Sequence, residues 1–127
     1  MKKIINTENA PAPLGPYNQA VLIEGKTLYI SGQIAINPTN GAFVLDSIEA
    51  ETTQVMHNLE AILQAADMTF DNVIKSSIFI SDMDNFGNIN KIYGNYFNED
   101  TAPARETVEV AKLPKNVNVE ISMIAYK

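Results

Sequence analysis

The stretch TLYISGQIAI, residues 27–36, decides the fold that we expect for this sequence. Apolar and polar side chains alternate along it, which is the pattern of a β-strand with one buried face. The apolar side carries Leu28, Ile30, Ile34 and Ile36, and the other side carries Thr27, Tyr29, Ser31 and Gln33. We therefore expect residues 27–36 to form a half-buried strand of a β-sheet.

Turn signals flank this strand on both sides. Glu24-Gly25-Lys26 precedes it and would pair it with residues 19–23 as a hairpin. Asn37-Pro38-Thr39-Asn40-Gly41 follows it and cannot continue a strand, because proline lacks the backbone donor and Asn-Gly favours positive φ. We predict a turn there.

Two later segments have the spacing of amphipathic helices. The first begins at Ile48, with Asp46 or Ser47 as its N-cap. Its apolar face carries Ile48, Val55, Leu59, Ile62, Leu63 and Ala66. The second is expected to begin with Asp84 as its cap, and its apolar side carries Phe86, Ile89, Tyr93 and Tyr96 or Phe97.

Three further strands are expected, at residues 73–80, 105–110 and 117–125. The order of strands, helix, strand, helix and strands predicts an α+β fold, a mixed or antiparallel sheet covered on one face by two helices. The final strands carry too much valine and isoleucine for a fully exposed second face. We therefore expect a homo-oligomer.

The composition limits the class of protein. The 127 residues predict a single domain over 1–127, and the net charge of −6 disfavours nucleic acid as a partner. No apolar run is long enough to span a membrane, and the apolar stretch of a signal peptide is missing after Lys2-Lys3-Ile4-Ile5, so we expect a cytoplasmic protein. Without cysteine, and with His57 as the only histidine, we expect no metal site and interpret His57 as a surface residue.

Two charged residues are candidates for chemistry. Arg105, the only arginine, stands at the start of a strand and could hold a carboxylate through two parallel hydrogen bonds; the alternative is an ion pair at the surface or in an interface, with one of the fifteen acids as its partner. Glu120 lies in a strand of mostly apolar residues. It is either on a solvated face, or partly desolvated with a raised pKa, in which case it could activate a water.

Three uncharged sites, the Ser31-Gly32 pair, Tyr17 and Asn90, each have a functional and a structural interpretation. Glycine in Ser31-Gly32 marks a bulge or the close approach of a ligand, or it only adjusts the strand twist. Tyr17 could reach a ligand with its hydroxyl, or it is an edge aromatic with a solvated tip. Asn90 contacts a ligand or makes a helix-packing hydrogen bond.

Several motifs together resemble the RidA (YjgF-like) family over essentially the whole chain. They are Asn9-Ala10-Pro11, Gly15-Pro16-Tyr17, Ser31-Gly32-Gln33, Pro103-Ala104-Arg105, Val108-Glu109-Val110-Ala111-Lys112-Leu113-Pro114 and Val119-Glu120-Ile121. The resemblance implies a chorismate-mutase-like fold, and a homotrimer with a central β-barrel and clefts between subunits. It also implies hydrolysis of enamines and imines such as 2-aminoacrylate and 2-iminobutyrate to 2-oxo acids and ammonia, without a cofactor.

The resemblance assigns residue roles as well. Arg105 would bind the substrate carboxylate and Glu120 would orient the attacking water. The cleft would be lined by Tyr17, Ser31, Gly32 and Asn90, with Thr107 close by. Thr107 stands where the family often has cysteine, which excludes thiol chemistry there but not hydrolysis. Glu106 is an unusually charged neighbour; by strand alternation it points away from Arg105 and should not compete for the guanidinium.

Other functions remain open at this stage. The main alternative is a non-catalytic module that binds a small carboxylate, such as a 2-oxo acid, in the same cleft. Nuclease activity, with which family members have been credited, is disfavoured by the negative charge and by the absence of a basic or aromatic stripe. Chorismate mutase activity rests on fold alone, and a fold does not determine function.

Overall fold

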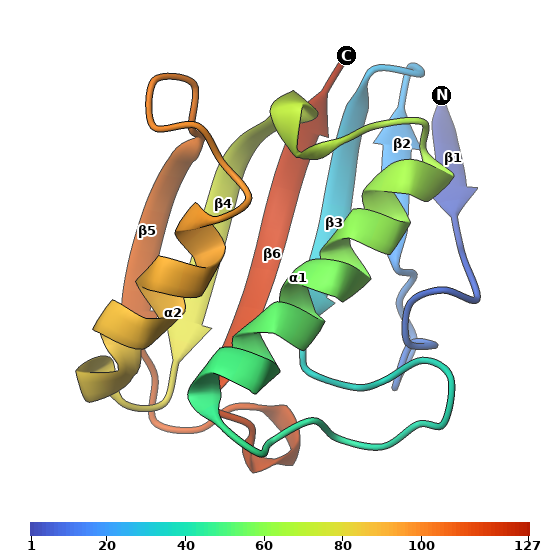
Figure 1. Cartoon of the computed structure of the whole chain (residues 1–127). Helices are drawn as coiled ribbons and strands as arrows, with labels where there is room; N and C mark the ends of the chain where they lie inside the picture. The colour runs from blue at the N-terminus through green and yellow to red at the C-terminus, as the bar shows by residue number, and fades with distance from the viewer.

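A six-stranded sheet carries the fold, and two helices cover one of its faces (Figure 1). The computed structural model describes all residues from 1 to 127. The strands are β1 (Lys2–Ile5), β2 (Ala20–Ile23), β3 (Thr27–Gln33), β4 (Val73–Ile80), β5 (Ala104–Glu109) and β6 (Val119–Tyr126), and the helices are α1 (Ile48–Ala65) and α2 (Phe86–Gly94). The strand order is β1-β2-β3-β6-β4-β5. Because β4 and β5 are parallel and the other pairs antiparallel, the sheet is mixed, and the expected α+β fold is confirmed.

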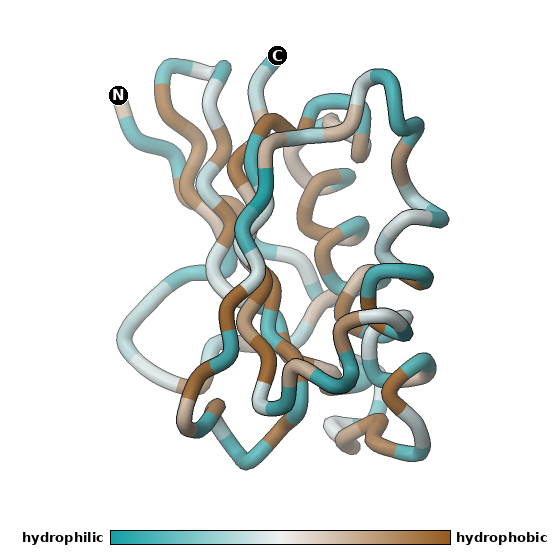
Figure 2. The backbone as a smooth tube through the Cα atoms, turned by 90° about the vertical axis from the view of Figure 1, so that its left-hand side faces the viewer, coloured by the Kyte–Doolittle hydropathy of each residue, from teal (hydrophilic) through white to brown (hydrophobic).

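The main core lies between the helices and the sheet. Alternate residues of β6 point into it, and it includes the buried face of α1; these are Val119, Ile121, Met123 and Ala125 of β6 and Val55, Leu59, Ile62 and Leu63 of α1. Burying each of the valine, leucine, isoleucine and methionine side chains among them contributes about 1.5–3 kcal/mol. Seen edge-on, the helices lie on one side of the strands only (Figure 2). None of the helices combines the length and apolar character needed to cross a membrane.

The face of the sheet that the helices leave uncovered is here called the open face. The valine and isoleucine of β6 that suggested a second cover are mostly packed under α1. Tyr29, Phe79, Val108 and Ile124 nevertheless remain on the open face, with Tyr29 51% and Val108 39% exposed. Ile4 and Val21 lie on this face as well, because Ile4 pairs with Val21 and Val21 with Tyr29. The open face therefore carries apolar side chains that a subunit interface could cover, and the homotrimer stays a prediction.

The beginnings of the two helices were predicted with different success. Ser47 caps α1, since its side chain accepts a hydrogen bond from the Ala50 amide at 3.0 Å. The prediction that Asp84 caps the second helix was wrong. It lies inside a single 3₁₀ turn that Asp82 caps, accepting from the Asp84 amide at 2.9 Å, and α2 begins only at Phe86.

The strand from residue 27 is shorter than expected. Its register against β6 shifts between Ile30 and Gln33, so one extra residue is inserted at Ser31-Gly32. This β-bulge confirms the bulge interpretation of the glycine, and it turns Gln33, expected on the polar side, toward the buried face. The alternation that assigned Ile34 and Ile36 to one face therefore does not apply beyond the bulge. The turns predicted before and after the strand are both present.

Candidate functional site

Arg105 is held on the helix-covered face of β5 by uncharged groups. Its Nη1 donates to Asn90 Oδ1 at 2.8 Å, and its guanidinium carbon lies 5.0 Å from the Tyr93 ring centre and 5.7 Å from that of Phe86. The two ion pairs of the structure join Lys75 to Glu106 and the N-terminus to Glu24, so no acid of the same chain pairs with Arg105, and the alternative of an ion pair within the chain is wrong. An amide and two rings orient the guanidinium without compensating its charge.

The supports of Arg105 are themselves fixed. The Tyr93 hydroxyl donates to Ser76 Oγ at 2.9 Å in the core, and burial raises the pKa of Tyr93, so this hydroxyl stays neutral. Asn90 of α2 accepts the hydrogen bond from Arg105 of β5, so its side chain makes a bond that packs the helix on the sheet and also orients the guanidinium; a contact of Asn90 with a ligand stays a prediction. The sequence showed Phe86 and Tyr93 as an apolar helix face, but it gave no sign that they stack on the arginine.

The two residues after Arg105 point to opposite faces. Glu106 lies on the open face, where it contacts Ser77 and pairs with Lys75 at 2.9 Å; these hydrogen bonds, Ser77 first, lower its pKa. The expectation that it does not compete for the guanidinium is confirmed. Thr107 lies on the same face as Arg105, and its Oγ1 is the only buried side-chain polar atom without a hydrogen-bond partner.

Glu120 lies on the open face of β6 against the bulge of β3. Glu120 is half-buried, and this burial raises the pKa of its carboxyl, in agreement with the partly desolvated interpretation. A side chain at Gly32 would overlap the carboxylate, since a Cβ there would lie only 2.9 Å from Glu120 Cδ. The group that lies close to the Gly32 backbone is therefore the carboxylate of Glu120.

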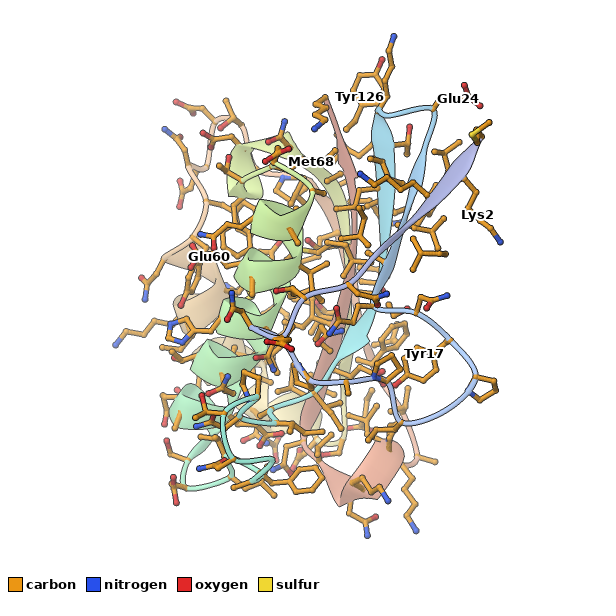
Figure 3. The ribbon with its side chains drawn as sticks, turned by 90° about the vertical axis from the view of Figure 1, so that its right-hand side faces the viewer. Lys2, Tyr17, Glu24, Glu60, Met68 and Tyr126 are labelled. Carbon is orange, nitrogen blue, oxygen red and sulfur yellow. The ribbon has the colours of Figure 1, made fainter.

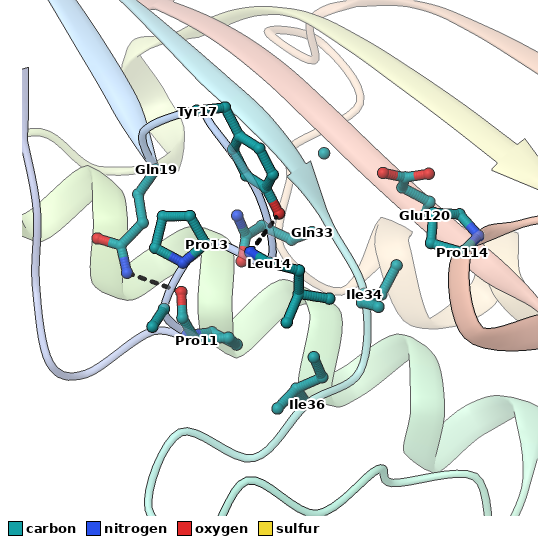
Figure 4. Close-up of a pocket in the computed structure, with 12 residues that line it drawn as sticks. Pro11, Pro13, Leu14, Tyr17, Gln19, Gln33, Ile34, Ile36, Pro114 and Glu120 are labelled. Carbon is teal, nitrogen blue, oxygen red and sulfur yellow. Dashed lines mark hydrogen bonds between the residues drawn. The ribbon is translucent and has the colours of Figure 1, made fainter.

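Hollow space surrounds Glu120. Tyr17, Gly32 and Pro114 line, together with Glu120, a cavity of about 50 Å³ that the loop around Pro11–Leu14 covers (Figure 4). The same four residues and Ser31 line a more open depression beside it. A small molecule could approach the carboxylate from this side.

Tyr17 belongs to the loop that covers this cavity, and it lies on the opposite side of the sheet from α1 (Figure 3). Its hydroxyl accepts from the Leu14 amide at 3.1 Å, and its side chain is 46% exposed. Ser31 Oγ donates to the Asn18 carbonyl at 2.6 Å, which ties the bulge to the same loop.

Gln19 anchors the beginning of that loop and was missed by the sequence reasoning. It is 3% exposed; its side chain accepts from the Thr7 amide at 2.7 Å and donates to the carbonyls of Thr7, Ala10 and Pro11. A single glutamine beside a strand carries no pattern that would distinguish it from a surface residue.

Within one chain, the candidate residues thus form two groups on opposite faces of the sheet. Arg105, Asn90 and Thr107 share the helix-covered face, whereas Tyr17, Ser31, Gly32 and Glu120 gather on the other side. Arg105 pairs with Ser76 and Ser76 with Met123, so Arg105 is two strands and three residues away from Glu120. At strand spacings of 4.8 Å and a rise of 3.4 Å per residue, their Cα atoms are about 14 Å apart, with side chains on opposite faces.

Comparisons with known proteins give a consistent result. The family model described as Endoribonuclease L-PSP matches residues 7–127. A RutC family protein of Pyrococcus horikoshii is 48% identical over 127 residues, 100% of this chain and 99% of the relative. A Mus musculus protein named 2-iminobutanoate/2-iminopropanoate deaminase is 43% identical over 125 residues, 98% of this chain and 91% of the relative.

Solved structures agree with these relatives. The Rid family protein YyfA of Yersinia pestis is similar with a TM-score of 0.95 and 46% identity over 100% of both chains. The E. coli protein TdcF, solved with bound serine, is similar with a TM-score of 0.91 and 37% identity over 98% of each chain. At these identities the likeness extends beyond the fold.

Proposed function

Since the chain belongs to the RidA (YjgF-like) family, whose model is described as Endoribonuclease L-PSP, we propose that it hydrolyses 2-imino and 2-enamino acids. Representative substrates are 2-iminobutyrate and 2-aminoacrylate, and the products are 2-oxo acids and ammonia. The observation that carries the proposal is the environment of Arg105. Neutral partners orient its guanidinium, and no acid of the same chain compensates the positive charge of that guanidinium. The deaminase name of the mouse relative supports the same reaction.

Arg105 would bind the substrate carboxylate. The guanidinium presents several N–H donors, of which Nη1 contacts Asn90, so donors remain for two parallel bonds to a carboxylate. An acid in the place of Asn90 would compete with the substrate for these donors. The neutral surroundings therefore favour a ligand that brings its own negative charge.

Glu120 would hold and deprotonate the attacking water. The water oxygen adds to the carbon of the protonated imine while one water proton passes to Glu120, which gives a neutral tetrahedral carbinolamine. Glu120 then returns this proton to the amine nitrogen, the C–N bond breaks, and ammonia leaves as the carbinolamine hydroxyl loses its proton and becomes the carbonyl. A carboxyl whose pKa is raised by burial is a stronger base than an exposed one, and such assistance contributes about 10²- to 10⁴-fold in rate.

A substrate of four carbons cannot bridge the two groups of a single chain. The carboxylate and the imine carbon of such a substrate are directly bonded, whereas Arg105 and Glu120 are separated by the sheet. We infer that the site forms between chains, with Arg105 from one chain and Glu120 from a neighbour. The homotrimer implied by the family resemblance would provide such clefts, and the apolar residues of the open face would support its interface.

Trapping the imine tests the proposal. A threonine or serine dehydratase generates 2-iminobutyrate or 2-aminoacrylate in place, and semicarbazide captures the imine that survives. We expect wild-type protein to reduce the semicarbazone signal and Arg105→Ala to leave it at the level without added protein. Equal trapping in all three samples would refute the deaminase proposal for these substrates.

A binding module for small carboxylates is the second candidate, because the Arg105 group is complete without Glu120. The serine in the structure of E. coli TdcF supports a ligand of this size. Saturable binding of a 2-oxo acid, lost in Arg105→Ala, together with an absence of turnover would favour it. Ribonuclease activity, suggested by the family model's description, finds little support in a chain of net charge −6.

A further inference from the structure

Glu51 is a buried acid for which the proposed mechanism has no use. It lies in the first turn of α1 and is 0% exposed. Neither ion pair of the structure includes it. A carboxylate taken out of water without a counter-charge must be compensated by hydrogen bonds, so its partners indicate what it is for.

Its partners are Asn118, which directly precedes β6, and Val119, the first residue of β6. Glu51 Oε2 accepts from the backbone amides of Asn118 at 2.7 Å and Val119 at 3.1 Å, and Oε1 accepts from Asn118 Nδ2 at 2.8 Å. These two residues directly precede Glu120. The carboxylate therefore fixes the backbone immediately before the proposed catalytic glutamate.

The β-bulge explains why this backbone needs Glu51. The pairing of β3 with β6 ends at Gln33 and Ile121, because the chain leaves the sheet after the bulge. Residues of β6 before Ile121 consequently have no partner in β3. Gly32 in the bulge makes room for the Glu120 carboxylate, and the same distortion removes the β3 partner from one edge of the start of β6, which stays paired with β4 on its other edge.

We propose that Glu51 is a positioning residue for Glu120: its carboxylate replaces the missing strand partner at the start of β6 and so holds the Glu120 carboxylate against Gly32. The inference rests on the proposed function for its kinetic consequences, whereas its structural part is independent of the reaction. The hydrogen bonds require an acceptor, not a charge. In Glu51→Gln the amide oxygen can accept from the two backbone amides, and the amide nitrogen can donate to Asn118 Oδ1 if the Asn118 side-chain amide rotates so that its oxygen and nitrogen exchange places. Ser81 Oγ, 3.4 Å from Asn118 Oδ1, tolerates this rotation because a hydroxyl can donate or accept.

The test compares Glu51→Gln with Glu51→Met, which is similar in length but offers no oxygen. Glu49→Met is the matched control, because Glu49 is an exposed acid in the same helical turn. We expect Glu51→Gln and Glu49→Met to keep kcat within about threefold of wild type, and Glu51→Met to lose on the order of tenfold or more in kcat with little change in KM. If Glu51→Met does not fold, Asn118→Ala, which removes only one of the three bonds, should lose less kcat but in the same pattern.

A second readout needs no activity. Glutamate labelled with carbon-13 at the side-chain carboxyl allows Glu120 to be titrated by NMR, with Glu120→Gln as the assignment control. Tyr17 is the only other titratable side chain that lines the hollow around Glu120. We expect the pKa of Glu120 to fall toward the ordinary value in Glu51→Met, because the freed carboxylate reaches water, and to stay raised in Glu51→Gln.

The outcomes separate the two proposals. If wild-type protein has no deaminase activity but the titration behaves as expected, the proposed function fails and the role of Glu51 stands. If the Glu120 titration and kcat are unchanged in Glu51→Met, Glu51 does not position Glu120. A loss in Glu51→Gln as large as in Glu51→Met would also overturn the proposal, since the charge and not the acceptor would then matter.

Discussion

The division of the site between two faces of the sheet predicts that two inactive variants restore each other. Arg105→Ala lacks the carboxylate clamp and Glu120→Gln lacks the base, so each alone should be inactive. In an oligomer of both chains, a cleft works when its Arg105 comes from the Glu120→Gln chain and its Glu120 from the Arg105→Ala chain. Under random mixing at equal amounts each condition holds for about half of the clefts, so about a quarter of wild-type activity should return.

The assay is the loss of semicarbazone after the two chains are unfolded together and refolded. Wild type mixed with the double variant provides the control for subunit exchange. About a quarter of wild-type activity is expected there if each site uses two chains, and about half if each site uses one. Half of the activity in the control, with none from the mixed single variants, would refute the two-chain site.

Four further predictions concern single side chains. Asn90→Asp should raise KM by on the order of tenfold, about 1.4 kcal/mol, with less effect on kcat, because the new acid pairs with Arg105; steady-state kinetics with Asn90→Ala as the comparison would show it. Gly32→Ala should lower kcat strongly while the KM stays near that of wild type, since the added methyl group overlaps the Glu120 carboxylate. Glu120→Gln should raise the melting temperature at pH 7, because the raised pKa of Glu120 means that its ionisation disfavours the folded state; the gain should vanish below the ordinary pKa of glutamate, and a stabilisation that persists there would contradict this cause. Thr107→Val should stabilise the protein by about 1 kcal/mol in thermal unfolding, because it removes a buried hydroxyl without a partner, and a fall in stability would mean that this hydroxyl is paired in the assembled protein.

Periodicity was sufficient for most of the fold. The strand at 73–80 and the helix from Ile48 were predicted at the positions where they occur, because their apolar residues repeat at the period of their element. Asp84 failed for a local reason: three acids or amides that can cap a turn follow one another at residues 82, 84 and 85, and spacing alone does not say which one does. A bulge at Ser31-Gly32 was one of the interpretations that the sequence left open, but its effect on the residues after it was not foreseen.

The site was predictable as a list of residues but not as a geometry. Strand alternation correctly predicted that the side chains of Arg105 and Glu106 lie on different faces of the sheet, because alternation depends only on neighbours in one strand. The relation of Arg105 to Glu120 depends on register across β4, which no local pattern contains. Glu51 was overlooked because an acid in the first turn of a helix is usually exposed there, although its spacing of four from Val55 and eight from Leu59 places it on the buried face.

Separation of Arg105 from Glu120 within a chain has a physical advantage. At an ion-pair distance of 4 Å, a guanidinium and a carboxylate near a protein surface attract by about 4 kcal/mol, which would lower the pKa of the acid and occupy the donors of the arginine. Within one chain neither effect is present: burial raises the pKa of Glu120, and Arg105 contacts an amide and two rings. If a neighbouring chain brings the two groups to the ends of one cleft, the substrate carboxylate and the water lie between them. Arg105 then binds the substrate carboxylate and Glu120 contacts the water, so the two charged groups do not pair with each other. A site folded within one chain would need additional packing to keep them apart.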